Sequence, residues 1–149
     1  MASSLDIAIP ALCAWRENRG GGALGMQSVL NVLQNRANRD RTTMYAEAVK
    51  KLQFSSLTAK GDPELTLWPV EGDPQYVEAE QMMQEALAGQ LADITHGATI
   101  YYAPTGIGPS SQTFAVPGGA TVPFPENWQQ SKVQFTTGIE NQLFFKEIA

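Results

Sequence analysis

The sequence predicts a single mixed α+β domain, residues 1–149, that is mainly helical with a small β part at its C-terminal end. Two segments with apolar residues at helical spacing carry the helical prediction, one from Ala23 to Arg39 and one that begins at Asp73. The β prediction comes from residue 97 onward, where short alternating runs replace the helical period. A chain of 149 residues fits one domain and buries a core without disulfides or metals.

Two helices are expected to flank a glycine-rich break near the N-terminus. The first spans Leu5 to Trp15 and ends near Glu17, and Pro10 is expected to kink it or delay its start. Residues 20–22 are all glycine and interrupt the helix. The second helix, Ala23 to Arg39, places five apolar residues on one face: Met26, Val29, Leu30, Leu33 and Ala37.

Two further helices are predicted before residue 90, with an irregular segment from Gln53 to Glu71 between them. The first, Thr43 to Leu52, is short, and we expect it to turn Met44, Val49 and Leu52 inward. The second begins with Asp73 as N-cap and Pro74 in its first turn, and Gly89 is its expected C-cap. Its buried stripe consists of Ala79, Met82, Met83, Ala86 and Leu87.

The C-terminal third is predicted to contain the β structure. Ala98 to Ala103 is β-like, and Gln134 to Phe145 holds two short β-like runs around Gly138. Between them, Pro104 to Pro125 is rich in Gly, Pro, Ser and Thr and indicates a long surface loop or hairpin. Loops of this length in a compact domain are often functional.

Charge and hydropathy exclude several classes of protein. Net charge is −5, with a balance of +4 in residues 1–60 and −9 in residues 61–149, so the broad basic face of a nucleic-acid binder is not expected. No apolar stretch approaches the length of a membrane span. The first ten residues lack a basic n-region, so we expect no secretory signal and synthesis in the cytoplasm.

Single copies of cysteine and histidine limit the metal and redox chemistry that we expect. Cys13 lies in an apolar helical stretch and is interpreted as a small buried hydrophobe. His96 is interpreted as a solvated turn residue. One cysteine and one histidine are too few for a zinc site, so we expect neither a metal nor another cofactor.

The candidate for acid chemistry is Glu17, which stands at the end of the first helix and before the glycine-rich turn. The apolar start of the next helix follows, and burial against it is expected to raise the pKa of the Glu17 carboxyl. A glutamic acid with a raised pKa acts as a general acid near neutral pH. Local spacing leaves open a simpler role, in which Glu17 pairs with Arg16 or Arg19 on the surface.

Four motifs in order resemble the spore cortex-lytic (SleB-type) cell-wall hydrolases over about residues 8–145. In that family a helix ends in Glu-Ala-Arg-Gly, and the next opens with Gly-Met or Gly-Gln and closes with Asn-Arg. The matching residues here are Glu17, Arg19, Gly20, Gly25, Met26, Val29, Asn35 and Arg36; Gln53, Phe54 and Ser55; Asp93, Thr95, Gly97, Ala98, Tyr101 and Tyr102; and Trp128 with the run Ile139 to Phe145.

The sequence also departs from this family pattern. Ile94 replaces a proline, Gly21 and Gly22 replace a second glycine position and a glutamate, and Glu140 and Gln142 replace a glycine and a histidine of the final motif. The segment from Ile107 to Pro125 looks longer than in many relatives. These differences affect the substrate preference that the resemblance implies and leave the assignment of Glu17 as the acid unchanged.

The resemblance implies a lysozyme-like fold and cleavage of the β-1,4 bond between N-acetylmuramic acid and N-acetylglucosamine. It implies lytic transglycosylation, with Glu17 as the one catalytic acid and base. A hydrolytic muramidase is the alternative, with Asp62, Glu64 or Asp93 as its second polar group. A catalytically inactive wall-binding or virion structural module is a third possibility.

Further residues are expected to bind the glycan strand. Gln53 and Ser55 either contact the sugar or cap an irregular loop. Of Tyr101 and Tyr102, strand alternation sends one ring into the core and the other toward the cleft. Trp68 and Trp128 either line a sugar groove or pack in the core.

The expected partner is therefore the glycan strand of peptidoglycan, bound by a monomer. A cell-wall substrate lies outside the cytoplasm, so release or export by another system is expected, as for a phage endolysin.

Overall fold

The computed structural model describes residues 4–50, 57 and 61–148, and it divides into two compact units. Unit 1 comprises residues 1–94 and is helical, whereas unit 2 comprises residues 95–149 and is built from strands. The mixed α+β prediction is confirmed. The sequence predicts one domain over residues 1–149, and the boundary between the units follows the change of character noted after residue 97 to within a few residues.

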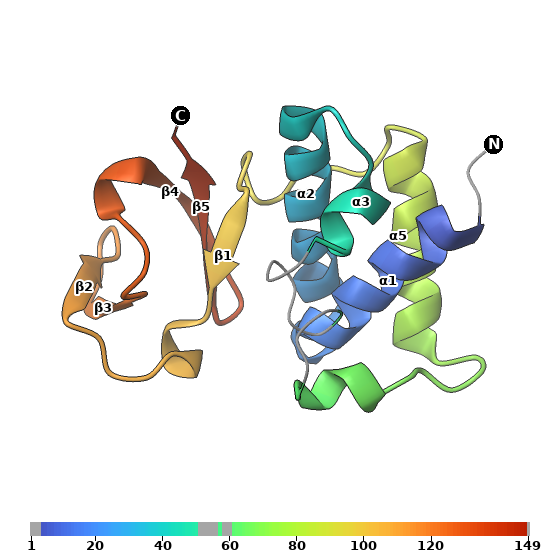
Figure 1. Ribbon diagram of the computed structural model, residues 1–149, viewed down its shortest axis with the longest axis horizontal. Helices are drawn as coiled ribbons and strands as arrows, with labels where there is room; N and C mark the ends of the chain where they lie inside the picture. Colours follow the sequence, from blue (N-terminus) through green and yellow to red (C-terminus); the bar gives the residue numbers. More distant parts are fainter. Residues whose placement is uncertain (1–3, 51–56, 58–60, 149) are drawn as a thin grey trace. The chain divides into compact units, whose positions relative to one another are not determined.

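In unit 1, helix α1 (Ser4–Asn18) packs against α2 (Gly22–Asp40), α3 (Met44–Ala48) and α5 (Pro74–Leu87) (Figure 1). The described residues of this unit also include two 3-10 turns: η1 (Arg19–Gly21) joins α1 to α2, and η2 (Pro63–Thr66) precedes α5. Helix α1 passes through Pro10, which lies buried inside it, rather than starting after it.

Side-chain caps start α3 and α5 where the sequence predicts. The Thr43 hydroxyl accepts a hydrogen bond from the Ala46 amide, 3.0 Å away. The Asp73 carboxylate accepts from the amides of Gln75 and Tyr76, both at 3.0 Å, so the predicted N-cap is confirmed. Each cap satisfies an amide that the first turn of a helix leaves without an intrahelical partner.

The core of unit 1 follows the predicted apolar stripes with two exceptions. All five predicted residues of α2 are buried, and so are Met44 of α3 and the stripe of α5 up to Ala86. Val49 and Leu87, however, are 42% and 45% exposed, because each lies at the end of its helix and turns away from the core. Leu52 lies outside the described residues.

Unit 2 contains a three-stranded antiparallel sheet in the order β1-β5-β4 and a separate β2–β3 hairpin. The strands are β1 (Ile100–Tyr102), β2 (Gln112–Ala115), β3 (Thr121–Phe124), β4 (Val133–Ile139) and β5 (Gln142–Glu147). The segment Pro104–Pro125 thus contains a hairpin. The two β runs predicted around Gly138 are present as β4 and β5. The turn between them is at Glu140 and Asn141, so Gly138 lies within β4 rather than between the strands.

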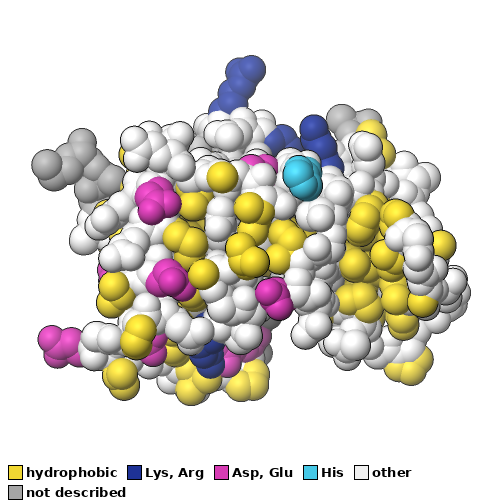
Figure 2. Space-filling model, turned by 180° about the vertical axis from the view of Figure 1, so that it is seen from behind, with side chains coloured by type: hydrophobic (Ala, Val, Ile, Leu, Met, Phe, Trp, Pro, Cys, Tyr) yellow, Lys and Arg dark blue, Asp and Glu magenta, His cyan; other side chains and the backbone are white. Residues whose placement is uncertain are grey.

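The core of unit 2 is a cluster of aromatic rings. Phe124 and Phe145 are fully buried, and Tyr102 stacks on Phe145 with ring centroids 5.9 Å apart. Partly buried hydrophobic residues surround them: Ile100, Ile107, Phe114, Trp128, Val133, Phe135 and Leu143. Hydrophobic side chains gather at the visible surface of this unit toward the right of Figure 2. Aromatic packing of this kind holds a small sheet together.

Candidate functional site

Glu17 is the penultimate residue of α1 and is partly buried. It follows a run of seven buried residues, from Pro10 to Arg16, that fix this end of the helix in the core of unit 1. The carboxyl therefore stands at the junction of a rigid helix and the turn that leaves it. This is the position that the sequence predicts for it.

Two glycines allow the chain to fold back sharply after Glu17. Gly22 has φ 67° and ψ −156°, a backbone conformation that side chains disfavour. Gly25 lets the first turn of α2 approach the end of α1, since a Cβ at that position would lie 2.9 Å from the backbone oxygen of Asn18. The glycines of the motif thus bring α2 against the residue that follows Glu17.

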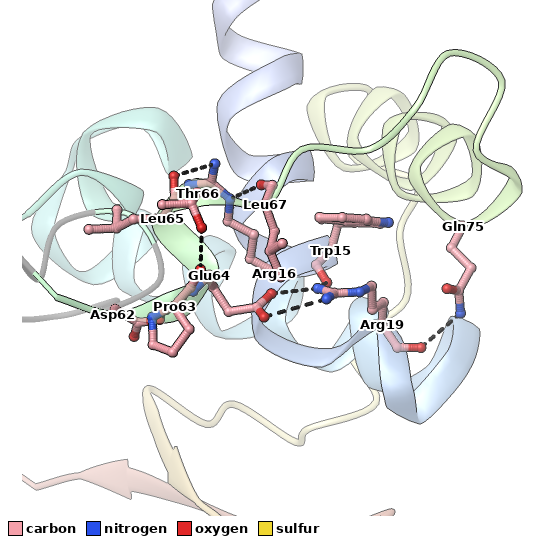
Figure 3. A network of polar contacts seen from close by, with 10 residues as sticks. All are labelled: Trp15, Arg16, Arg19, Asp62, Pro63, Glu64, Leu65, Thr66, Leu67 and Gln75. Atoms are coloured by element: carbon pink, nitrogen blue, oxygen red, sulfur yellow. Dashed lines mark hydrogen bonds and ion pairs between the residues drawn. The ribbon is translucent and has the colours of Figure 1, made fainter.

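Arg19 is held by an acid and an aromatic ring of unit 1. Its Nη1 lies 2.6 Å from the Glu64 carboxylate, and its guanidinium lies 4.1 Å from the centroid of the Trp15 ring (Figure 3). Gln75 donates a hydrogen bond to the Arg19 carbonyl. Arg19 thus pairs with Glu64.

Arg16 binds a segment of chain that is remote in sequence. Its Nε donates to the Leu67 carbonyl at 3.0 Å and its Nη2 to the Leu65 carbonyl at 3.4 Å (Figure 3). The guanidinium also lies 4.6 Å from the centroid of the Trp68 ring. Burial lowers the pKa of Arg16, and the nearby carboxylate of Glu64 acts in the opposite direction. No local pattern reveals these contacts, because the two acceptors lie 49 and 51 residues along the chain.

Cys13 lies one helical turn before Glu17 and is completely buried. Burial raises the pKa of the thiol, and the charge of Glu17 raises it further. The interpretation of Cys13 as a small buried side chain is confirmed.

The acids that would serve a hydrolytic mechanism as a second carboxylate each have a structural partner. Asp62 accepts a hydrogen bond from the Glu64 amide at 2.8 Å and begins η2. Glu64 pairs with Arg19. Asp93 is exposed and accepts a hydrogen bond from Asn35 Nδ2 at 3.0 Å.

The predicted tyrosine pair divides as strand alternation requires. Tyr102 is buried, and its hydroxyl donates to the Pro123 carbonyl at 2.8 Å, while burial raises its pKa. Its ring and its hydroxyl both serve the core of unit 2. Tyr101 is only partly buried and lies beside Phe144, with ring centroids 5.4 Å apart. Tyr101 is thus the more exposed member of the pair.

The remaining predicted residues fall into three groups. Gln53 and Ser55 lie outside the described residues. Trp128 packs in the aromatic cluster, with Tyr102 5.4 Å away, whereas Trp68 is exposed. His96 is exposed in a turn, with φ 56°.

Unit 2 also carries a pocket of about 260 Å³, lined by Ile107, Gly108, Pro109, Ser110, Pro125, Glu126 and Asn127. The Glu126 carboxylate closes the loop beside it by accepting from the amide and the hydroxyl of Ser111, at 2.6 and 2.8 Å. Within residues 4–50, 57 and 61–148, no group of three or more His, Cys, Asp or Glu side chains is placed to hold a metal ion. Among the helices described above, none is long and apolar enough to cross a membrane.

No protein-family model matches the chain, and neither a curated protein nor a solved structure matches it.

Proposed function

We propose that this protein degrades peptidoglycan by cleaving the β-1,4 bond between N-acetylmuramic acid and N-acetylglucosamine. The proposed reaction is lytic transglycosylation, and Glu17 is its general acid and base. The observation that carries the proposal is the position of Glu17, partly buried at the end of α1, within the motif that resembles the cell-wall hydrolases. A lysozyme-like fold for the catalytic part belongs to the same proposal.

The surroundings of Glu17 suit a carboxyl that gains and loses a proton. The C-terminal end of a helix carries a partial negative charge, which favours the protonated form of a nearby acid. Partial burial acts in the same direction. Arg19, two residues after Glu17, forms an ion pair with Glu64. A protonated acid that becomes a base after the first step is what this reaction needs.

The proposed chemistry needs a single carboxyl group. Glu17 donates its proton to the glycosidic oxygen as the bond from that oxygen to the anomeric carbon of muramic acid breaks. The Glu17 carboxylate then takes the proton of the muramic 6-hydroxyl, and the oxygen of that hydroxyl forms the new bond to the anomeric carbon. The products are a free hydroxyl on one sugar and a 1,6-anhydro ring on the other, and Glu17 is protonated again.

A hydrolytic muramidase is the second candidate, since it shares the acid and differs in the nucleophile. It needs a second carboxylate that positions water or forms a covalent bond. Asp62, Glu64 and Asp93 are each engaged with an amide, an arginine or an asparagine. Their engagement favours the mechanism that uses one acid.

Digestion of purified peptidoglycan followed by mass spectrometry of the fragments tests the proposal. Transglycosylation gives fragments that end in 1,6-anhydromuramic acid. Each is lighter by one water (~18 mass units) than the corresponding fragment with a reducing end that hydrolysis gives. Fragments with reducing ends would show that the protein hydrolyses the bond as a muramidase does, and would contradict the proposed transglycosylation. Absence of cleavage would leave a wall-binding or virion structural module.

The proposal extends to partner and place of action. The partner is the glycan strand, and the enzyme acts as a monomer. As in a phage endolysin, the protein reaches the wall from the cytoplasm by means of another system.

A further inference from the structure

The segment from Glu64 to Leu67, which comprises most of η2 and the residue after it, is fixed to the end of α1. Arg16, only 7% exposed, donates to the carbonyls of Leu65 and Leu67. The ion pair between Arg19 and Glu64 holds the start of the same segment. Both arginines flank Glu17 within two residues, so the backbone of residues 64–67 is tied to the end of the helix that carries the acid.

Trp68 comes next in this fixed segment, and its side chain is 68% exposed. One face of its ring lies against the Arg16 guanidinium, at 4.6 Å from the ring centroid. The other two tryptophans differ, because Trp15 is buried and Trp128 packs in the aromatic cluster. Tryptophan is largely buried on average in folded proteins, so an exposed indole that is held in one orientation indicates a binding role.

The contact with Arg16 prepares the indole for a ligand. A guanidinium over the face of tryptophan restricts the ring, so less side-chain entropy is lost when a ligand binds the opposite face. The guanidinium is itself fixed by the Leu65 and Leu67 carbonyls. The ring therefore presents a flat, preorganised apolar surface.

The surroundings of the ring favour a sugar over an anionic membrane. Membrane-surface tryptophans stand among basic residues that attract anionic lipid headgroups. The chain around Trp68 is instead acidic, with Asp62, Glu64, Glu71 and Asp73 within six residues. A pyranose ring has an uncharged face of C–H groups that stacks on an aromatic ring and is not repelled by carboxylates.

We propose that Trp68 is a stacking platform for an N-acetylhexosamine ring of the glycan strand. The proposal rests on the proposed function, since it places this ring on the same strand that Glu17 cleaves. Trp68 is a binding residue, and Arg16 is the residue that positions it. Arg16 precedes Glu17 in α1, and its guanidinium contacts the Trp68 ring. The position of the platform relative to the acid is therefore fixed within unit 1.

Calorimetric titration with chitohexaose, a soluble β-1,4-linked N-acetylglucosamine hexamer, tests this directly. All proteins carry Glu17→Gln so that the probe is not cleaved. Trp68→Ala should weaken binding by about fivefold or more, the effect of removing an aromatic platform from a nucleobase. Trp68→Phe should recover most of the affinity because it keeps a ring. The matched control is Val70→Ala, at an exposed residue of the same segment that lacks the guanidinium contact, and it should bind like the parent.

Fluorescence and kinetics separate failure of this inference from failure of the proposed function. The sugar should shift and quench the emission of the parent, and Trp68→Phe should bind without that change. On purified peptidoglycan, Trp68→Ala with an intact Glu17 should raise KM more than it lowers kcat. A wild-type protein that digests peptidoglycan, beside a Trp68→Ala variant with unchanged KM and unchanged sugar affinity, would overturn the platform alone. A wild-type protein that neither digests peptidoglycan nor binds chitohexaose would overturn both proposals.

Discussion

The two units bury different kinds of side chain in their interiors. Unit 1 buries Arg16, Arg36 and Glu47 among its apolar stripes, and the Glu47 carboxylate, 1% exposed, pairs with Lys50 at 2.8 Å. The large side chains that are fully buried in unit 2, those of Phe124, Phe144 and Phe145, are aromatic, and its buried polar residues, Thr95 and Thr99, are uncharged. Burying a charge is costly unless it has partners. In unit 1, Arg16 donates hydrogen bonds to backbone carbonyls and Glu47 forms an ion pair.

This difference bears on the proposal that unit 1 carries the catalytic acid. A protein tolerates expensive buried charges where they position a functional group, and one of those in unit 1, Arg16, lies next to Glu17 at the end of α1. Unit 2 uses its tyrosine hydroxyl and its glutamine and serine side chains to close its own loops. We infer that unit 1 supplies the acid, and the following substitutions test the contrast, beginning with the largest expected effect on stability.

Phe145→Ala should destabilise unit 2 by about 3–5 kcal/mol, because the ring is completely buried among other rings and its removal leaves a cavity. Denaturant unfolding followed by near-ultraviolet circular dichroism measures the change. Phe114→Ala is the matched control in the same cluster, where the ring is only partly buried and the cost should be smaller. Equal costs for the two variants would contradict a core centred on Phe145.

Gly25→Ala should destabilise unit 1 by about 1–3 kcal/mol, since the added methyl group meets the Asn18 backbone and one helix must shift. It should also lower activity on peptidoglycan, because the helix that moves carries Glu17. Gly20→Ala is the matched control in the same motif: nothing lies within 4 Å of its Cβ position. The close approach of α1 and α2 would be refuted if Gly25→Ala and Gly20→Ala unfolded at the same denaturant concentration.

The smallest effects should come from two exposed carboxylates, one in each unit. Hydrogen bonds from Arg39 and from Lys50 hold the pKa of Asp40 below its usual range, and the Ser111 amide and hydroxyl lower the pKa of Glu126. A carboxyl group whose pKa is lower in the folded than in the unfolded protein stabilises the fold at pH values above its unfolded-state pKa. This stabilisation is lost as the pH falls through the folded-state pKa.

Asp40→Asn and Glu126→Gln should therefore cost stability at pH 7 and progressively less below about pH 4, the ordinary range of these carboxyls. Unfolding of each variant and of the wild-type protein across this pH range measures the difference. A difference that stayed constant from pH 7 to pH 3 would mean that neither carboxylate is stabilised by its partners.

Local rules predicted much of the fold. The Asp73 cap and the apolar stripe of α2 follow from patterns within one helix, which is why both are confirmed. The two β runs predicted around Gly138 are present, but the turn between them lies at Glu140, which has a positive φ of 53°, and the glycine remains in the strand. The boundary between the two units lies close to the change from helical to alternating patterns in the sequence, but that pattern does not show that the two parts form separate compact units.

The candidate site shows the same limit. Glu17 was found because it ends a helix in a recognisable motif, and helix ends are local. The contacts of Arg16 with Leu65, Leu67 and Trp68 join residues about fifty positions apart, so no spacing rule indicates them. The ion pair between Arg19 and Glu64 also joins residues far apart in sequence. The sequence indicated Glu64 only as a possible second catalytic acid.

The central claim is that Glu17 is the acid that cleaves the glycan strand. The most direct measurement compares turnover of purified peptidoglycan by the wild-type protein and by Glu17→Gln, with Glu64→Gln as a control that removes a carboxylate from the same neighbourhood. Glutamine keeps the shape of the side chain but cannot donate and recover a proton. Turnover by Glu17→Gln should fall by at least about 10²–10⁴-fold with an unchanged melting temperature, whereas Glu64→Gln should keep most of its activity. A folded Glu17→Gln variant that retained turnover within a few-fold of the wild-type protein would contradict the claim.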